Sequence, residues 1–213
     1  MDSRSATERL HQRALVLLAR HGIVSRESLD GAAEPGGFSA IYPVLREMEE
    51  LGRVRRGHFC EGASSAQFAL PGVVDRLRAF RARPASPQAV LLSSLDPAQP
   101  FGAQLPWPST PAGRPRRAVG TAVVLVDGAP VLFVERAGRR LLSFATSERE
   151  SGEARLLAAI HALVAGMGRL GVKRMAVEQV DGEPARNAPF AALFLKAGFR
   201  EDYRGYEIER TRR

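Results

Sequence analysis

Hydrophobic positions recur with helical spacing in the first part of the chain. Apolar side chains at Leu10, Ala14, Leu17 and Leu18 fall on one face of a predicted helix. Gly22 lies just after the last of these positions and is a natural end for a helix. The chain therefore opens with an amphipathic helix whose apolar stripe is available for a core.

Two more helices and a hairpin are predicted after the first helix. Ser25 can begin a short helix, because its hydroxyl can accept hydrogen bonds from free backbone amides. Residues 54–60 and 67–70 predict a β-hairpin, and a further helix follows at 72–83. The third helix covers residues 39–51, and its predicted buried face comprises Ile41, Tyr42, Leu45, Met48 and Leu51. This order predicts a winged helix-turn-helix domain at residues 1–83.

Residues 84–117 are rich in proline, alanine and serine, and they carry Trp107 between two prolines. Residues 89–93 could form a short strand, but the rest predicts an extended connector that packs along the next domain. Because so long a stretch without regular structure is uncommon inside a compact domain, we place a domain boundary near its start.

A second domain is predicted at residues 118–213. Two apolar, β-branched runs at 119–126 and 130–135 flank Asp127-Gly128, a strong signal for a hairpin turn. The remaining elements are a strand at 140–145, a helix from Ser151 to about residue 168, a strand at 174–180, a helix at 189–197 and a strand at 203–209. The predicted order is βββαβαβ, and the fold class of the whole chain is α+β.

The charge of the chain favours a polyanionic partner such as nucleic acid. The formal net charge is +8 and the sequence pI is about 10.8. Almost all of the positive charge is arginine in a chain rich in alanine and glycine, which GC-biased coding also produces, so charge alone is weak support. Because no apolar run reaches the length of a membrane span and the first residues lack a signal peptide, we expect a cytoplasmic, nucleoid-associated protein.

Several kinds of catalytic and metal site are not expected in this chain. ATP hydrolysis needs a phosphate-binding loop of the form G-x-x-x-x-G-K-[ST], and the sequence has none. The four histidines stand singly and Cys60 is the one cysteine, so we expect no metal site, no disulfide and no cofactor. The ordinary role of Cys60 would be that of a small hydrophobic residue.

Basic residues at the base of the predicted wing are candidates for phosphate contact. The alternatives are a solvated basic face and a domain interface. The third helix is a poor reader of DNA, because Glu47, Glu49 and Glu50 would repel phosphate. We therefore expect little sequence specificity. The candidate residues in the wing are Arg53, Arg55, Arg56 and His58.

The second domain offers a further set of arginines. Arginines around the first and second strands could meet at one basic edge, and a groove for a single strand would also need an exposed aromatic side chain. Trp107 or Phe101 could stack on a base, but flanking prolines favour a packing role for Trp107. The arginines of this set are Arg114, Arg116, Arg117, Arg136, Arg139 and Arg140.

Five stretches together resemble the C-terminal region of bacterial Lhr-type DNA helicases. They are RALVLLARHGIVSRESL, PGGFSAIYPVLREMEELGRVRRGHF, AQFALPGVVDRLR, SLDPAQPFGAQLPWP and VVLVDGAPVLFVERAGRRLLSF. The resemblance covers residues 13–205. It implies a last winged helix followed by a terminal β-rich domain, with the motor upstream. The implied role is an accessory DNA-binding or scaffolding module of a repair helicase, with DNA and the upstream domains as partners and homo-oligomerisation left open.

The resemblance also raises the hypothesis of an enzyme. Some Lhr-type proteins are associated with uracil removal from DNA, a reaction in which a carboxylate holds water against an oxocarbenium-like centre. The candidate acids are Glu201, Asp202, Glu207 and Glu209. Asp202 is the preferred catalytic residue, and its ordinary role would be that of a solvated turn residue. Gln67 stands alone, so the paired glutamines of winged-helix glycosylases are missing.

Two other families remain as alternatives. LGVKRMAVEQV and NAPFAALFLKAGFRE resemble the end of a GNAT acetyltransferase, but ATSERESGEA lacks the loop that would hold coenzyme A. SAIYPVLREMEELGRV resembles the third helix of PadR-like regulators, but the chain continues into a proline-rich segment where a dimerising helix would be needed.

Overall fold

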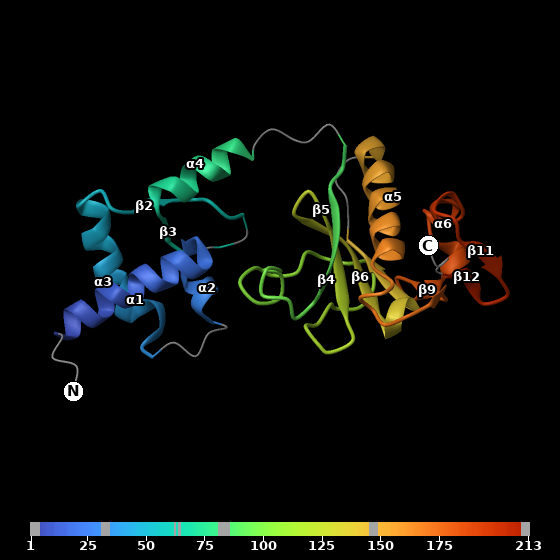
Figure 1. The fold of residues 1–213 in the computed structure, drawn as a ribbon, viewed down its shortest axis with the longest axis horizontal. Helices are drawn as coiled ribbons and strands as arrows, with labels where there is room; N and C mark the ends of the chain where they lie inside the picture. Colours follow the sequence, from blue (N-terminus) through green and yellow to red (C-terminus); the bar gives the residue numbers. More distant parts are fainter. Residues whose placement is uncertain are drawn as a thin grey trace. The chain divides into compact units, whose positions relative to one another are not determined.

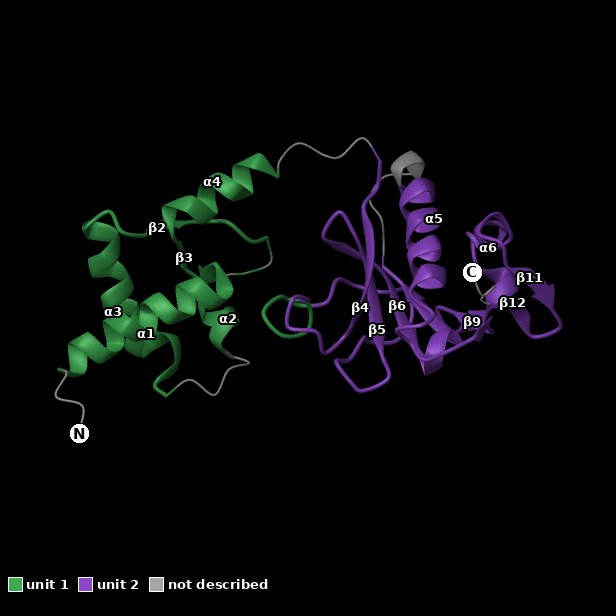
Figure 2. Cartoon of the chain, viewed as in Figure 1, with its two compact units in different colours: residues 1–83, 100–106 green, residues 84–99, 107–213 purple. Residues whose placement is uncertain are grey.

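The computed structural model describes residues 5–30, 35–61, 63, 65–80, 86–144 and 149–209 (Figure 1). The chain forms two compact units, shown in different colours in Figure 2. The first comprises residues 1–83 and 100–106, and the second comprises residues 84–99 and 107–213. Each unit has its own core.

The first unit is a winged-helix domain, as the sequence predicts. A three-stranded antiparallel sheet of order β1-β3-β2 joins its helices. In chain order the elements are α1 (Ala6–His21), β1 (Ile23–Val24), α2 (Arg26–Asp30), α3 (Gly37–Glu50), β2 (Arg55–Gly57), β3 (Gln67–Ala69) and α4 (Pro71–Ala79).

Helix α1 is fixed at both ends by the residues that the sequence places there. Ser5 and Glu8 form a capping box, in which the Ser5 hydroxyl accepts from the Glu8 amide at 3.1 Å and the Glu8 carboxylate accepts from the Ser5 amide at 3.0 Å. At the other end the Gly22 amide donates to the Leu18 carbonyl at 2.9 Å, with φ of 72°. The helix thus begins and ends within one turn of its apolar stripe.

Helix α3 supplies much of the first core, with one exception to the predicted face. Ile41, Leu45 and Met48 are buried, and Tyr42 packs its ring against Phe68 with centroids 5.9 Å apart. Leu51 was expected on this face but is 63% exposed, because it lies at the cap after the helix has ended. The prediction for Leu51 was wrong.

The second unit is built on two sheets. The larger has the order β10-β9-β7-β6-β5-β4, with antiparallel neighbours except the parallel pair β7 and β9; the smaller is antiparallel with the order β11-β12-β8. The strands are β4 (Ala89–Ser93), β5 (Ala122–Val126), β6 (Ala129–Glu135), β7 (Arg140–Ser143), β8 (Arg174–Val177), β9 (Gln179–Val180), β10 (Glu183–Pro184), β11 (Arg200–Asp202) and β12 (Gly205–Glu209). The helices are α5 (Arg149–Ala165) and α6 (Ala191–Lys196), with short 3₁₀ turns η1 (Arg136–Gly138) and η2 (Ala185–Asn187).

Helix α5 covers one face of the larger sheet, alongside β4, β5 and β6 (Figure 1). Ile160, Leu163 and Met167 are fully buried in the core that it closes. After the helix, the chain passes close to β4 at Gly166, where a Cβ atom would lie 2.3 Å from the Leu91 side chain. The core therefore needs both the helix and β4.

The segment predicted as a connector, residues 84–117, is divided between the two units. Strand β4 pairs with β5 along its whole length, which makes residues 89–93 part of the second unit. Residues 100–106 group with the first unit, where the Gln104 side-chain nitrogen lies 3.0 Å from Nδ1 of His21. Trp107 packs against Phe133 and Phe144, with ring centroids 5.3 and 5.8 Å away, so it has the packing role that its prolines favour.

The predicted order βββαβαβ has the right elements in the right sequence but is incomplete. The strand predicted at 119–126 begins only at Ala122, and Val119 is 91% exposed. The strand predicted at 174–180 divides at Glu178 into β8 and β9, which belong to different sheets. The strand predicted at 203–209 begins only at Gly205, as β12; Tyr203 and Arg204 form the turn that joins it to β11, a strand that the prediction lacked.

Candidate nucleic-acid interface

The wing presents exposed basic side chains on the edge strand β2 and in the residues that flank it. Arg53, Arg55, Arg56 and His58 are all exposed. Nε of Arg56 lies 3.4 Å from the Glu49 carboxylate of α3, so that charge is partly neutralised. In the part of the chain that the structure describes, the side chains of Arg53 and Arg55 make no ion pair. These two arginines are therefore the cations that the wing offers to a partner.

The turn of the wing is held by the buried side chain of Gln67. Its carbonyl oxygen accepts from the amides of Phe59 and Cys60 at 2.9 and 2.8 Å. Its nitrogen donates to the carbonyls of Cys60 and Ala63 at 3.1 and 3.3 Å. Because all of its hydrogen-bonding groups are used in the wing, Gln67 is structural and is not available to a substrate. Burial raises the pKa of the Cys60 thiol, which suits the small hydrophobic residue expected there.

The predicted basic edge of the second domain divides in two. Arg136, Arg139 and Arg140 come together around η1, where they line a hollow. Arg114 and Arg116 are exposed but do not line it, and Arg117 donates to the Gln99 carbonyl at 2.8 Å. The turn η1 thus gathers three of the six arginines.

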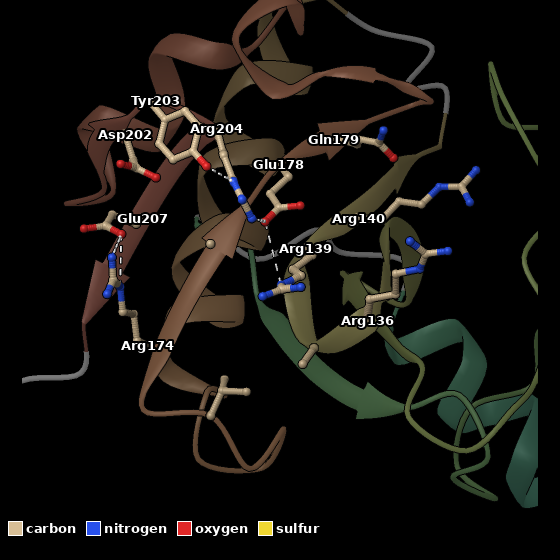
Figure 3. A pocket seen from close by; sticks show the side chains of 13 residues that line it. Arg136, Arg139, Arg140, Arg174, Glu178, Gln179, Asp202, Tyr203, Arg204 and Glu207 are labelled. Carbon is tan, nitrogen blue, oxygen red and sulfur yellow. Dashed lines mark hydrogen bonds and ion pairs between the residues drawn. The ribbon is translucent and has the colours of Figure 1, made fainter.

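The hollow beside η1 has a volume of about 680 Å³ and is rich in charge (Figure 3). It is formed by η1, by β8, and by the turn between β11 and β12. Five arginines and three carboxylates line it, which leaves a net positive charge. They are Arg136, Arg139, Arg140, Arg174, Arg204, Glu178, Asp202 and Glu207.

Most of these arginines are paired. The Glu178 carboxylate lies 3.8 Å from Nε of Arg139 and 3.9 Å from a guanidinium nitrogen of Arg204, which point toward it from opposite sides (Figure 3). Arg174 is hydrogen-bonded to Glu207 on the neighbouring strand, and this contact raises the pKa of its guanidinium above the ordinary value. A hydrogen bond to Tyr203 likewise raises the pKa of Arg204. The Arg174 and Arg204 guanidinium groups therefore remain positively charged.

Arg140 and Arg136 lie at the other end of the hollow. Nε of Arg140 is 3.4 Å from the Glu135 carboxylate. Arg136 is exposed, and its side chain makes no ion pair or hydrogen bond with the rest of the described chain. Both residues also line a second hollow of about 1010 Å³, together with Arg169. Arg136 therefore stands between the two hollows as a cation free to meet an anion.

The turn η1 has an unusual backbone. Arg136 and Ala137 have φ of 51° and 57°, in the left-handed region that non-glycine residues rarely adopt. Gly138 follows with φ of 97°, and a Cβ atom there would lie 2.7 Å from Met175 of β8. The packing of the turn against β8 holds this strained backbone in place. The backbone of the turn thereby fixes the direction in which the Arg136 side chain projects.

Asp202 ends β11 at the rim of the first hollow. Its carboxylate lies on the same side as Glu207 and Arg174 (Figure 3) and makes no ion pair within 4 Å among the described residues. Its backbone carbonyl accepts a hydrogen bond from Arg186. The described residues contain no group of three or more metal-ligating side chains. None of the described helices is long and apolar enough to cross a membrane.

Comparisons with known proteins agree in pointing to one family. The family model described as large helicase-related protein, winged-helix domain, matches residues 3–89, which include every element from α1 to α4. The chain is 36% identical over 209 residues to the Escherichia coli protein named Lhr helicase/uracil glycosylase, covering 94% of this chain and 13% of that protein. It is 46% identical over 144 residues to the Mycolicibacterium smegmatis protein named Lhr helicase/probable uracil glycosylase, covering 65% of this chain and 10% of that one.

The chain corresponds to a C-terminal region of Lhr-type helicases. The resemblance stated from the sequence is thereby confirmed, as is the winged helix within it. The chain spans about a tenth of the length of these Lhr-type relatives. The family relation therefore identifies the region of an Lhr-type helicase to which the chain corresponds, and the activity of this region is a matter for experiment.

Sequence reasoning missed part of the hollow. Glu207 was among the candidate acids, but Arg174, Glu178, Tyr203 and Arg204 were not candidates, because the prediction gives two continuous strands at 174–180 and 203–209. The signal that was available is Gly205, which follows Tyr203 and Arg204 at the position where the chain turns back.

Proposed function

We propose that this chain is an accessory DNA-contacting module of an Lhr-type helicase. The observation that carries the proposal is the exposed pair Arg53 and Arg55 on the wing, whose charges no carboxylate of the described chain neutralises. The net charge of +8 and the family relation support it. The sequence has no phosphate-binding loop, so the motor would be supplied by other domains of the parent protein.

The wing is better suited to the DNA backbone than to the bases. An exposed edge strand with arginines can follow phosphates, and such contacts carry no sequence information. The outer surface of α3 carries Glu47 and Glu50, which repel phosphate and disfavour insertion of this helix into the major groove. We therefore propose binding of low sequence specificity, with the wing as the contact.

A double substitution in the wing tests this proposal. Arg53→Ala with Arg55→Ala should weaken binding to a fluorescent duplex about tenfold at moderate salt, because two phosphate contacts are lost. Fluorescence anisotropy on the intact chain measures the affinity. Both side chains are exposed and make no ion pair in the described chain, so folding should be unaffected.

The matched control removes two other positive charges. Arg46→Ala with Arg78→Ala takes arginines that are already paired with Glu50 at 3.2 Å and Asp75 at 3.3 Å. This control should bind duplex DNA nearly as well as the wild-type chain. Equal losses in both double variants would show that net charge, and not the wing, determines binding.

A second candidate function is base excision at the hollow beside η1. The carboxylate of Asp202 lines a hollow large enough for a nucleobase, and both relatives carry uracil glycosylase in their names. In such a reaction the carboxylate would take a proton from water as the oxygen bonds to the sugar carbon and the base leaves with the bonding electrons. Gln67 takes no part, because its side chain is used in the wing.

A further inference from the structure

The hairpin between β11 and β12 carries an aromatic ring that the second core does not use. Tyr203 lies in the turn and is 76% exposed. The Arg204 guanidinium lies 5.1 Å from the ring centroid and is hydrogen-bonded to the phenol oxygen. Arg204 is in turn held by Glu178. The ring is thus held at its hydroxyl by its own neighbour, while most of its surface remains open to solvent.

The hollow next to this ring has the charge that a nucleic-acid backbone requires. Arg136 lies at the opposite end of the hollow from Tyr203 (Figure 3). Its charge is free, whereas Arg139, Arg174 and Arg204 are paired with carboxylates. A strand that reached from Tyr203 to Arg136 would pass over these ion pairs. The excess of positive charge in the lining comes from Arg136 and its neighbour Arg140.

An aromatic ring beside a positive channel is the arrangement that binds single-stranded nucleic acid. Bases stack on exposed aromatic side chains, while arginines follow the phosphates. In a duplex the faces of the bases are covered by their neighbours, so a ring such as Tyr203 can stack only on an unpaired base. The volume of about 680 Å³ is in the range of sites that hold small organic groups.

We propose that the hollow beside η1 binds single-stranded DNA, with one unpaired base stacked on Tyr203 and a neighbouring phosphate held by Arg136. This inference rests on the proposed DNA contact and adds a second site, in the second unit, with a preference for single strands. Tyr203 takes the role for which the sequence offered only Trp107 and Phe101. Trp107 is unsuited to it, because it packs on Phe133 and Phe144.

Substitutions of Tyr203 in the intact chain test the stacking. Tyr203→Ala should weaken binding to a single-stranded oligonucleotide about tenfold, because base–aromatic stacking is lost. Tyr203→Phe keeps the ring and should bind within about twofold of the wild-type chain. Neither change should alter binding to a blunt duplex. Because Tyr203 is exposed, neither substitution should disturb folding, and circular dichroism of each variant checks this.

Two further readouts separate stacking from a general change of the surface. A 2-aminopurine base in the oligonucleotide should lose fluorescence on binding the wild-type chain and Tyr203→Phe, but not Tyr203→Ala. Arg136→Ala should make the salt dependence of single-strand binding shallower by about 0.7, the slope of one phosphate contact. Together the two variants would place a base and a phosphate at opposite ends of the hollow.

The outcomes distinguish this inference from the proposed function. Unchanged single-strand binding in Tyr203→Ala would overturn the inference, and duplex binding that still depends on Arg53 and Arg55 would leave the proposed function standing. Equal losses for duplex and single strand in Tyr203→Ala would also overturn it, since stacking affects only unpaired bases. If the wild-type chain binds neither DNA, both proposals fail.

Discussion

Gln67 and Asp202 are two polar side chains that differ in what their neighbours leave free. Gln67 is 1% exposed and makes four hydrogen bonds within the wing. Asp202 lies at the rim of a hollow, with its carboxylate unpaired among the described residues. The sequence made Asp202 the candidate catalytic residue, whereas Gln67 stood alone and matched no catalytic motif. Only their partners decide that the side chain of Gln67 is structural and that the carboxylate of Asp202 is left free within the described chain.

Asp202→Asn tests the second candidate function at the scale of a single residue. If the hollow excises uracil, the wild-type chain releases the base from uracil-containing single-stranded DNA, and Asp202→Asn slows this by about 100-fold or more. The amide keeps the shape of the carboxylate but cannot accept the proton. Base release is measured by treating the DNA with alkali, which cleaves the strand at each abasic site.

Glu201→Gln is the control for this measurement. Glu201 is the exposed neighbour of Asp202 on β11 and does not line the hollow. The Glu201→Gln variant should therefore excise uracil at the wild-type rate. A wild-type chain without activity, or an Asp202→Asn chain with full activity, would remove base excision from consideration.

At the scale of elements, the hairpin of β11 and β12 and the turn η1 form the hollow together. Strand β12 pairs with both β11 and β8, so the hairpin that carries Tyr203 is fixed to the strand that carries Arg174. The turn η1 packs on β8 through Gly138 and Met175. Strand β8 therefore sets the distance between the two ends of the hollow.

Gly205→Ala should break this arrangement. A Cβ atom at residue 205 would lie 2.2 Å from the Val177 carbonyl oxygen of β8, and φ is 151°. Because the clash is with backbone, the strands must move apart, and we expect the second unit to lose about 2 kcal/mol or more of stability. Thermal or urea unfolding measures the loss.

Gly72→Ala is the matched control, since a Cβ atom there meets nothing within 4 Å and the residue lies in helix α4. It should be neutral or slightly stabilising, because alanine favours helix. An equally stable Gly205→Ala chain would contradict the close approach of β12 to β8.

The elements also show how far the sequence could lead. Periodicity located α1, α3 and α5, because each has a buried stripe several turns long. Gly22 predicted the end of α1, Ser25 predicted the start of α2, and Asp127-Gly128 predicted the turn between β5 and β6. Such signals act within a few residues and can be read from the sequence. The division of the predicted strand at Glu178 and the partner of β4 depend on contacts between distant residues, so local pattern could not reveal them.

At the scale of the whole chain, two units with separate cores carry two basic surfaces. The wing of the first has Arg53 and Arg55, and the hollow of the second has Arg136. The sequence suggested that six arginines near the first two strands of the second domain could meet at one edge. Of these six, the structure brings only Arg136, Arg139 and Arg140 into the hollow, because Arg117 is directed to the Gln99 carbonyl and Arg114 and Arg116 do not line it.

The salt dependence of duplex binding by the intact chain tests the central claim most directly. If the chain contacts DNA through phosphate, the logarithm of the affinity falls linearly with the logarithm of the salt concentration. Removing Arg53 and Arg55 together should make this slope shallower by about 1.8, the value for two phosphate contacts. A wild-type affinity that does not respond to salt, or a slope unchanged in the double variant, would contradict the assignment of the wing as a DNA contact.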